Sequence, residues 1–179
     1  MSKIGKINIA IPDKVKVILS GNNINVEGPL GKKTLNFDND LFELIINDGK
    51  DILIKPKKVT QEIKRLWGMN RSLLNNAITG ISKGYEKILE LSGVGFRAAL
   101  KGKQLNLQLG FSHDVNFDIP DGIKITVEKQ TIIKITGFDK QQVGMIASQI
   151  KSIRPPEPYK GKCIKEQGQY ILRKEGKKK

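Results

Sequence analysis

Cysteine and histidine are almost missing from this 179-residue sequence, which contains one of each, Cys163 and His113. A single cysteine cannot form an intramolecular disulfide, and its isolation is typical of proteins from a reducing compartment. The two residues together cannot supply the several nitrogen and sulfur ligands of a zinc site. The sequence therefore predicts neither a disulfide framework nor a cysteine–histidine metal centre, and we expect no cofactor.

Aromatic residues and long apolar runs are also scarce. Aromatics make up 6% of the chain, so no sheet face lined with stacking rings, as in many single-strand RNA-binding modules, is evident. No apolar run approaches the roughly 20 residues of a membrane-spanning helix. Asn8, Pro12 and Asp13 interrupt the apolar positions near the N-terminus, which predicts no signal peptide. We expect a cytoplasmic protein with no membrane partner.

Residue patterns typical of enzymes are weak. Ser112, His113 and Asp114 are consecutive, but a catalytic triad is assembled in space, and neighbours on an extended segment point to opposite sides. A polar turn is the better interpretation of these three residues. Lys162 precedes Cys163, and its charge would lower the thiol pKa, but no partner base accompanies it. The sequence predicts that the protein is not an enzyme.

Positive charge is the dominant property of the composition. Lysine and arginine number 32 against 18 acidic residues, which gives a net charge of +14 and a pI of about 9.8. Residues 151–179 contain ten basic and three acidic residues, so this segment carries 10 − 3 = +7, half of the total. Such an excess favours a polyanionic partner over a merely solubilising surface. Because the segment offers little core-forming material, we expect it to be loosely ordered until it binds a partner.

A short internal repeat indicates a duplicated unit. Residues 11–17, IPDKVKV, recur as residues 119–125, IPDGIKI, at an offset of 119 − 11 = 108. Each copy leads into alternating β-branched and polar residues and then a second strand, over 24–28 and 132–137 respectively, which predicts two hairpins. Chance resemblance between two hairpins is the alternative, but the shared entry and similar loop length favour duplication.

Two amphipathic helices complete the predicted fold, over residues 60–81 and 139–153. Thr60 and Asp139 are suitable N-caps, and Pro155-Pro156 ends the second helix. We therefore predict an α+β protein of two similar small domains, 1–82 and 83–179, each an antiparallel sheet with one helix packed on a face, plus a basic C-terminal tail. The apolar stripes of the helices comprise Ile63, Leu66, Trp67, Leu74, Ala77, Ile78 and Ile81 in the first, and Val143, Ile146, Ala147 and Ile150 in the second.

Residues 93–98, GVGFRA, match the glycine pattern of a dinucleotide-binding turn. That turn requires a following helix, whose N–H groups hold the pyrophosphate. Here the chain instead runs into a tight turn at Gly102 and then into strand-like alternation, so residues 87–94 and 97–109 are predicted to form one antiparallel run. We interpret the glycines as a sharp backbone bend or a place where another chain approaches closely. An enzyme that holds a nucleotide here stays the alternative, and a nucleotide-binding isotherm tests it.

The pattern most suggestive of binding lies at residues 154–162, RPPEPYKGK. Its three prolines predict a stiff, extended segment. Arg154, Lys160 and Lys162 can reach phosphate oxygens, Tyr159 offers a ring for stacking, and Gly161 permits close backbone approach. A solvated proline-rich linker is the alternative, and the adjoining basic tail favours RNA binding. A generic RNA-binding module outside the ribosome also remains open at this point.

These residues resemble a known family. Residues 156–162, PEPYKGK, closely resemble the signature of the universal large-subunit ribosomal protein L6 family, bacterial type. The resemblance extends over essentially the whole chain, through SKIGK at 2–6, GVGFRA at 93–98, GFSH at 110–113 and RKEGK at 173–177. Two positions depart from the family pattern: Cys163 replaces its usual glycine, which makes the backbone path after Lys162 uncertain, and Asp114 replaces its common proline.

The resemblance implies two similar α+β domains and a structural role in the large ribosomal subunit of a bacterium or an organelle. It implies binding to large-subunit rRNA near the base of the lateral stalk, beside neighbouring ribosomal proteins and the surface that translation factors visit. In that family the second domain and tail supply most RNA contacts. The matching rRNA-binding positions are Gly93, Gly95, Phe96, Arg97, Ser112, His113, Arg154, Pro156, Glu157, Pro158, Tyr159, Lys160, Gly161, Lys162, Lys174 and Lys177.

Overall fold

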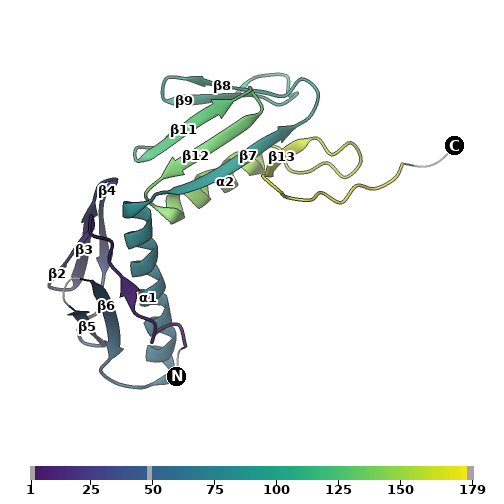
Figure 1. Cartoon of the computed structure of the whole chain (residues 1–179). Coiled ribbons are helices and arrows are strands. Elements are labelled where there is room, and N and C mark those ends of the chain that lie inside the picture. Colours follow the sequence, from purple (N-terminus) through teal and green to yellow (C-terminus); the bar gives the residue numbers. More distant parts are fainter. Residues whose placement is uncertain (1–2, 48–49, 177–179) are drawn as a thin grey trace. The chain divides into compact units, whose positions relative to one another are not determined.

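The computed structural model describes residues 3–47 and 50–176 and has two compact units, Met1–Gly84 (unit 1) and Tyr85–Lys179 (unit 2). The division falls two residues after the predicted end of the first domain. Each unit contains antiparallel sheets and one helix (Figure 1). The fold is α+β with two similar domains, as predicted from the sequence.

Unit 1 contains two three-stranded sheets and α1 (Gln61–Ser82). The helix begins as predicted, because the Thr60 side chain accepts a hydrogen bond from the Ile63 N–H at 3.3 Å. Its apolar stripe packs on β3, β4 and β6, except that Leu66 lies at the edge of the stripe and stays 36% exposed. The sheets have the orders β1-β6-β5 and β2-β3-β4, from strands β1 (Ile9–Ala10), β2 (Lys16–Ser20), β3 (Asn23–Gly28), β4 (Gly31–Asn36), β5 (Phe42–Asn47) and β6 (Asp51–Pro56).

Trp67 belongs to the core of unit 1, as the sequence predicted. Its ring is buried, and its indole Nε1 donates a hydrogen bond to the Ile54 carbonyl at 2.7 Å. A buried indole N–H needs such a partner, and the edge of β6 provides it. Trp67 is therefore a packing residue that is not available to stack on a base.

Unit 2 contains a four-stranded sheet, a three-stranded sheet and α2 (Lys140–Ile153). The Asp139 side chain caps α2 by accepting the Gln141 N–H at 3.0 Å, and the helix ends before Pro155. Figure 1 shows α2 running along the sheet that contains β7 and β12. The sheets have the orders β11-β12-β7-β13 and β10-β9-β8, from strands β7 (Tyr85–Ser92), β8 (Arg97–Lys101), β9 (Gln104–Gln108), β10 (Val115–Asp118), β11 (Ile123–Glu128), β12 (Ile132–Gly137) and β13 (Cys163–Glu166).

The two units share one fold, as a duplication predicts, but the two IPD segments do not occupy equivalent positions in them. Within the described residues, each unit has six strands followed by a helix, with the same pairing: β5-β6-β1 in unit 1 corresponds to β11-β12-β7 in unit 2, and β2-β3-β4 corresponds to β8-β9-β10. The hairpin after residues 11–13 therefore corresponds to β8-β9, not to the hairpin after residues 119–121. The prediction that the two hairpins 108 residues apart are equivalent was therefore wrong. Alternation of apolar and polar residues identifies any half-buried hairpin, whereas structural equivalence depends on which strands pair.

Two further predictions about unit 2 were wrong. Strands β8 and β9 do form the predicted antiparallel pair with a tight turn at Gly102, but β7 does not pair with β8, because β12 and β13 occupy its two edges. The C-terminal segment is also not uniformly loose: β13 pairs with β7, and Cys163 and Ile164 are fully buried. An open edge of β7 would leave backbone N–H and C=O groups without partners, and β13 satisfies them. Strand β13 has no counterpart in unit 1 within the described residues.

Candidate nucleic-acid interface

The loop after α2 folds back on itself instead of extending as predicted. The Gly161 N–H donates to the Glu157 carbonyl at 3.1 Å, and the Glu157 N–H donates to the Lys162 carbonyl at 3.3 Å. The prolines fix their own φ angles, but Gly161, with φ of +68°, reverses the chain. The loop 154–162 is thus a compact turn that presents Pro158, Tyr159 and Lys160 at its exposed tip.

Gly161 does permit a close approach, and the approaching group is an arginine of the same chain. The Arg173 Nε lies 2.6 Å from the position that a Cβ on Gly161 would occupy. The Lys174 N–H donates to the Pro158 carbonyl at 2.8 Å, which holds the C-terminal segment beside the loop. Arg173 was not among the predicted site residues, because in the sequence its basic side chain looks no different from the others in the tail.

The segment 110–113 meets this loop through an aromatic contact. The Arg154 guanidinium carbon lies 4.9 Å from the centroid of the Phe111 ring, and that ring is stacked with His113 at 6.4 Å between centroids. Ser112 and His113 are exposed. Asp114 accepts hydrogen bonds from Asn106 and Gln108, in agreement with a polar turn and not with a triad. Phe111 was not among the predicted site residues, although it lies within a segment singled out by the sequence.

The glycine-rich segment is a tight turn between β7 and β8. The Phe96 N–H donates to the Gly93 carbonyl at 3.3 Å, and Gly95 occupies the third position with φ of +82°, where glycine is strongly favoured. The predicted bend is confirmed. Val94 projects from its tip with 93% of its surface exposed, which the sequence did not predict.

Phe96 and Arg97 leave this turn in different directions. The Phe96 ring is buried and packs within 3.0 Å of the position of a Gly93 Cβ, so it supports the turn from the core side. Arg97 begins β8 and is exposed. Of these two predicted site residues, only Arg97 presents its side chain to solvent.

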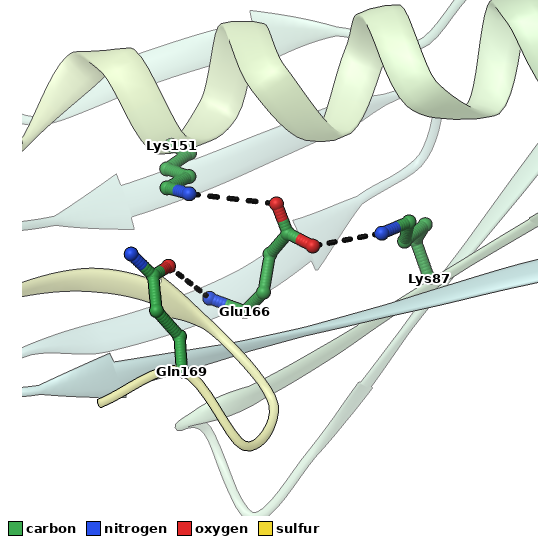
Figure 2. Close-up of polar contacts among 4 residues, drawn as sticks. All are labelled: Lys87, Lys151, Glu166 and Gln169. Carbon is green, nitrogen blue, oxygen red and sulfur yellow. Dashed lines mark hydrogen bonds and ion pairs between the residues drawn. The ribbon is translucent and has the colours of Figure 1, made fainter.

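Several charged residues of the C-terminal segment 151–179 form ion pairs within unit 2. Figure 2 shows Glu166 of β13 between Lys87 of β7 and Lys151 of α2, with N–O distances of 2.7 and 3.4 Å. The hydrogen bond from Lys87 is the main cause that lowers the pKa of Glu166, and Lys151 adds to it. Gln169 accepts the Glu166 N–H at 3.4 Å. These contacts attach β13 to the rest of unit 2, so Lys151 helps to stabilise the fold.

Cys163 is a buried core residue. Its side chain is fully buried, and this burial raises the pKa of its thiol, although Lys165 and Arg173 act in the opposite direction. Neighbouring charge does act to lower this pKa, as the sequence suggested, but desolvation of the thiolate is the larger effect and the net shift is upward. Cys163 lies in a regular strand without positive φ, so it causes no distortion after Lys162.

In the two described ranges, 3–47 and 50–176, no cluster of three or more histidine, cysteine or acidic residues could hold a metal ion. Across the same ranges, no helix is long and apolar enough to span a membrane. Lys177, one of the predicted site residues, lies outside the described residues.

Fold and site together define a class of protein: a duplicated α+β scaffold whose second unit gathers basic and aromatic side chains on neighbouring loops, in the manner of RNA-binding proteins. The model of the family described as "Ribosomal protein L6" matches residues 92–167. The chain is 50% identical to large ribosomal subunit protein uL6 of Methylocella silvestris and 48% identical to the protein of that name from Beijerinckia indica, over 179 residues and the full length of each pair. The protein so named from Caulobacter vibrioides is also 48% identical at full length.

The chain belongs to the ribosomal protein L6 family. This confirms the resemblance drawn from the PEPYKGK motif. These relatives are bacterial, as the tail motif predicted, and they are named as ribosomal proteins, in agreement with the expectation of a non-enzyme.

Proposed function

We propose that this protein is a structural constituent of the large ribosomal subunit that binds and stabilises large-subunit rRNA through unit 2. The observation that carries the proposal is the loop 154–162, which presents Tyr159 and Lys160 at an exposed tip and places Arg154 on the Phe111 ring. The names of the relatives support the assignment to that subunit. Family resemblance supports a position near the stalk base, beside neighbouring ribosomal proteins and the region that translation factors visit.

The proposed mechanism is electrostatic scaffolding. Six cations in and around the loops have no ion pair within the described residues, which leaves them available to phosphates: Arg97, Arg154, Lys160, Lys162, Arg173 and Lys174. Each neutralised phosphate releases counterions, so affinity falls as salt rises. The sheets and α2 fix the spacing of the loops, so the shape of the RNA contributes more to specificity than its base sequence. Of the predicted rRNA-binding residues, we propose that Phe96 acts by supporting the glycine turn.

Replacing Lys160 and Lys162 together by alanine tests this function. We expect weaker binding to large-subunit rRNA and a log–log salt slope that is smaller by roughly 1.4–1.8, because two phosphate contacts are lost. The charge-matched control is Lys55→Ala with Lys58→Ala, two exposed lysines of unit 1. Unchanged affinity of the first variant at an unchanged melting temperature would contradict the proposal.

Sedimentation of a cell extract through a density gradient tests the same function in the assembled particle. We expect the protein to migrate with the large subunit at moderate salt and to dissociate from it only at high salt. Migration as a free 20.0 kDa protein beside intact subunits would exclude the structural role.

A further inference from the structure

A second feature of unit 2 lies beside the loop 154–162, and only one of its residues, Arg173, has a part in the function proposed so far. A cleft of about 320 Å³ is lined by Ser92, Lys165, Gln169, Tyr170, Ile171 and Arg173. Its volume is near the lower end of the roughly 300–1,000 Å³ of ligand-binding clefts. Ser92 directly precedes the glycine turn, and Arg173 packs on Gly161, so the cleft adjoins both neighbouring loops.

The segment that forms one wall of the cleft is held at both ends. After β13, the Gln167 N–H donates to the Ile88 carbonyl and the Gln169 N–H donates to the Glu166 carbonyl, both at 3.0 Å. The Lys174 N–H bond to Pro158 fixes the other end at 2.8 Å. Residues 170–173 are therefore positioned before any ligand arrives, which reduces the entropy lost on binding.

Within this fixed segment the Tyr170 ring is 83% exposed. Burial in the core does not account for a ring so open to water, and an aromatic face of this kind is suited to stacking on a base. Arg173 beside it has no acidic partner within the described residues, whereas Lys165 is paired with Glu90 at 3.2 Å. The cleft thus combines one flat ring, one free guanidinium and the polar side chains of Ser92 and Gln169.

We propose that this cleft binds one unpaired nucleotide of the large-subunit rRNA, with its base stacked on Tyr170 and its phosphate at Arg173. A ring next to a cation fits a nucleotide, which offers a flat base and an anionic phosphate a short distance apart. The proposal rests on the function proposed above and adds a stacking site to it. Tyr170 and Ser92 were not among the residues that the sequence pointed to, and Arg173 was noted only as part of the basic tail and the RKEGK motif, not as a site residue.

Affinity of the full chain for large-subunit rRNA, measured for three variants, tests the stacking site. We expect Tyr170→Ala to weaken binding by roughly 5- to 150-fold, as loss of one base–aromatic stack does. Tyr170→Phe keeps the ring and should retain most of the affinity. Leu172→Ala is the matched control, because Leu172 is 76% exposed on the same segment but does not line the cleft. Thermal unfolding of all three variants should match that of the wild type.

Salt dependence separates stacking from charge. Tyr170→Ala should leave the log–log salt slope unchanged, whereas Arg173→Ala should reduce it by roughly 0.7–0.9, one phosphate contact. Equal affinities of Tyr170→Ala and Leu172→Ala would overturn the stacking site, whether both match the wild type or both are weakened. If the Lys160 and Lys162 variant still loses affinity in that case, the proposed function stands without the cleft. Failure of the wild-type protein to bind rRNA would remove both proposals.

Discussion

The Arg154 guanidinium lies over the Phe111 ring, with 4.9 Å between the guanidinium carbon and the ring centroid, and so connects the end of α2 to a loop 154 − 111 = 43 residues earlier in the chain. The ring is itself stacked with His113. A cation held on an aromatic face has fewer conformations to lose when it meets a phosphate. The contact therefore restricts the Arg154 side chain and joins two loops of the proposed interface.

A double-mutant cycle with Arg154→Ala and Phe111→Leu measures this contact. We expect the two losses in the free energy of unfolding to be non-additive by about 0.5–1 kcal/mol, because the pair is partly exposed. Chemical denaturation of the four proteins at pH 7 gives the coupling energy. Additive losses would show that the two side chains are neighbours without an energetic interaction.

Gly161→Ala should damage rRNA binding more than it damages the fold. Its positive φ imposes a cost of roughly 1–2 kcal/mol on any residue with a Cβ. The new methyl group also meets the Arg173 guanidinium, but this is the end of a flexible side chain and can move away. We therefore expect a moderate fall in melting temperature and a clear loss of rRNA affinity, measured by calorimetry and a binding titration.

Gly168→Ala is the matched control for that substitution. Gly168 also has positive φ, at +78°, but a Cβ there would meet no atom within 4 Å. It should lower stability by a similar amount and leave rRNA affinity almost unchanged. In an Arg173→Ala background, Gly161→Ala should cause little further loss of affinity. A full additional loss there would show that the effect does not pass through Arg173.

The Cys163 thiol should react with a thiol reagent only after the protein unfolds. Its side chain is fully buried, and burial raises the pKa of the thiol, so the folded protein presents almost no thiolate at pH 7. Labelling with a chromogenic disulfide reagent, with and without denaturant, checks this. Rapid labelling of the folded protein would contradict the position of β13 at the edge of the sheet.

Cys163→Gly should lower the free energy of unfolding by roughly 1–3 kcal/mol, although glycine is usual at this position in the family. The substitution empties a fully buried site and places glycine inside a strand. Cys163→Ala is the control that removes only the sulfur, and it should cost less. Denaturant unfolding of both variants gives the difference, and equal costs would show that strand propensity has no part in it.

Glu166→Gln should destabilise the protein by about 0.5–1 kcal/mol at pH 7, because the pairs with Lys87 and Lys151 are partly exposed. The pKa of Glu166 is lowered in the folded protein, so its ion pairs contribute stability above the ordinary glutamate pKa of about 4.3. That contribution is lost as the pH falls through the lower, folded-state pKa. The difference between wild type and variant should therefore shrink in acid.

Urea unfolding at a series of pH values from 7 downwards measures this dependence. Glu175→Gln is the control, because Glu175 is exposed and has no ion pair within the described residues. It should track the wild type at every pH. A Glu166→Gln difference that persists undiminished in acid would mean that packing, and not charge, is what the glutamate contributes.

Local patterns in the sequence identified the elements but not their partners. The caps at Thr60 and Asp139 and, apart from Leu66, the apolar helix stripes correspond to observed structure. The pairing of β7 with β12 and β13, and the equivalence of β2-β3 with β8-β9, were not predicted. Caps and periodicity act within one or two turns of chain, whereas strand pairing joins residues that are far apart in the sequence.

Sequence patterns identified the class of molecule: a basic α+β protein with two helices, a glycine bend, a polar turn around His113 and a family signature at residues 156–162. The folding back of the PEPYKGK segment, the position of Arg154 on Phe111 and the packing of Arg173 on Gly161 became evident only from the folded structure. It also separated tail charges that pair internally, such as Lys151, from those without an ion pair within the described residues. Composition and local pattern fix charge and backbone preference, but the neighbour of each side chain depends on how distant segments pack.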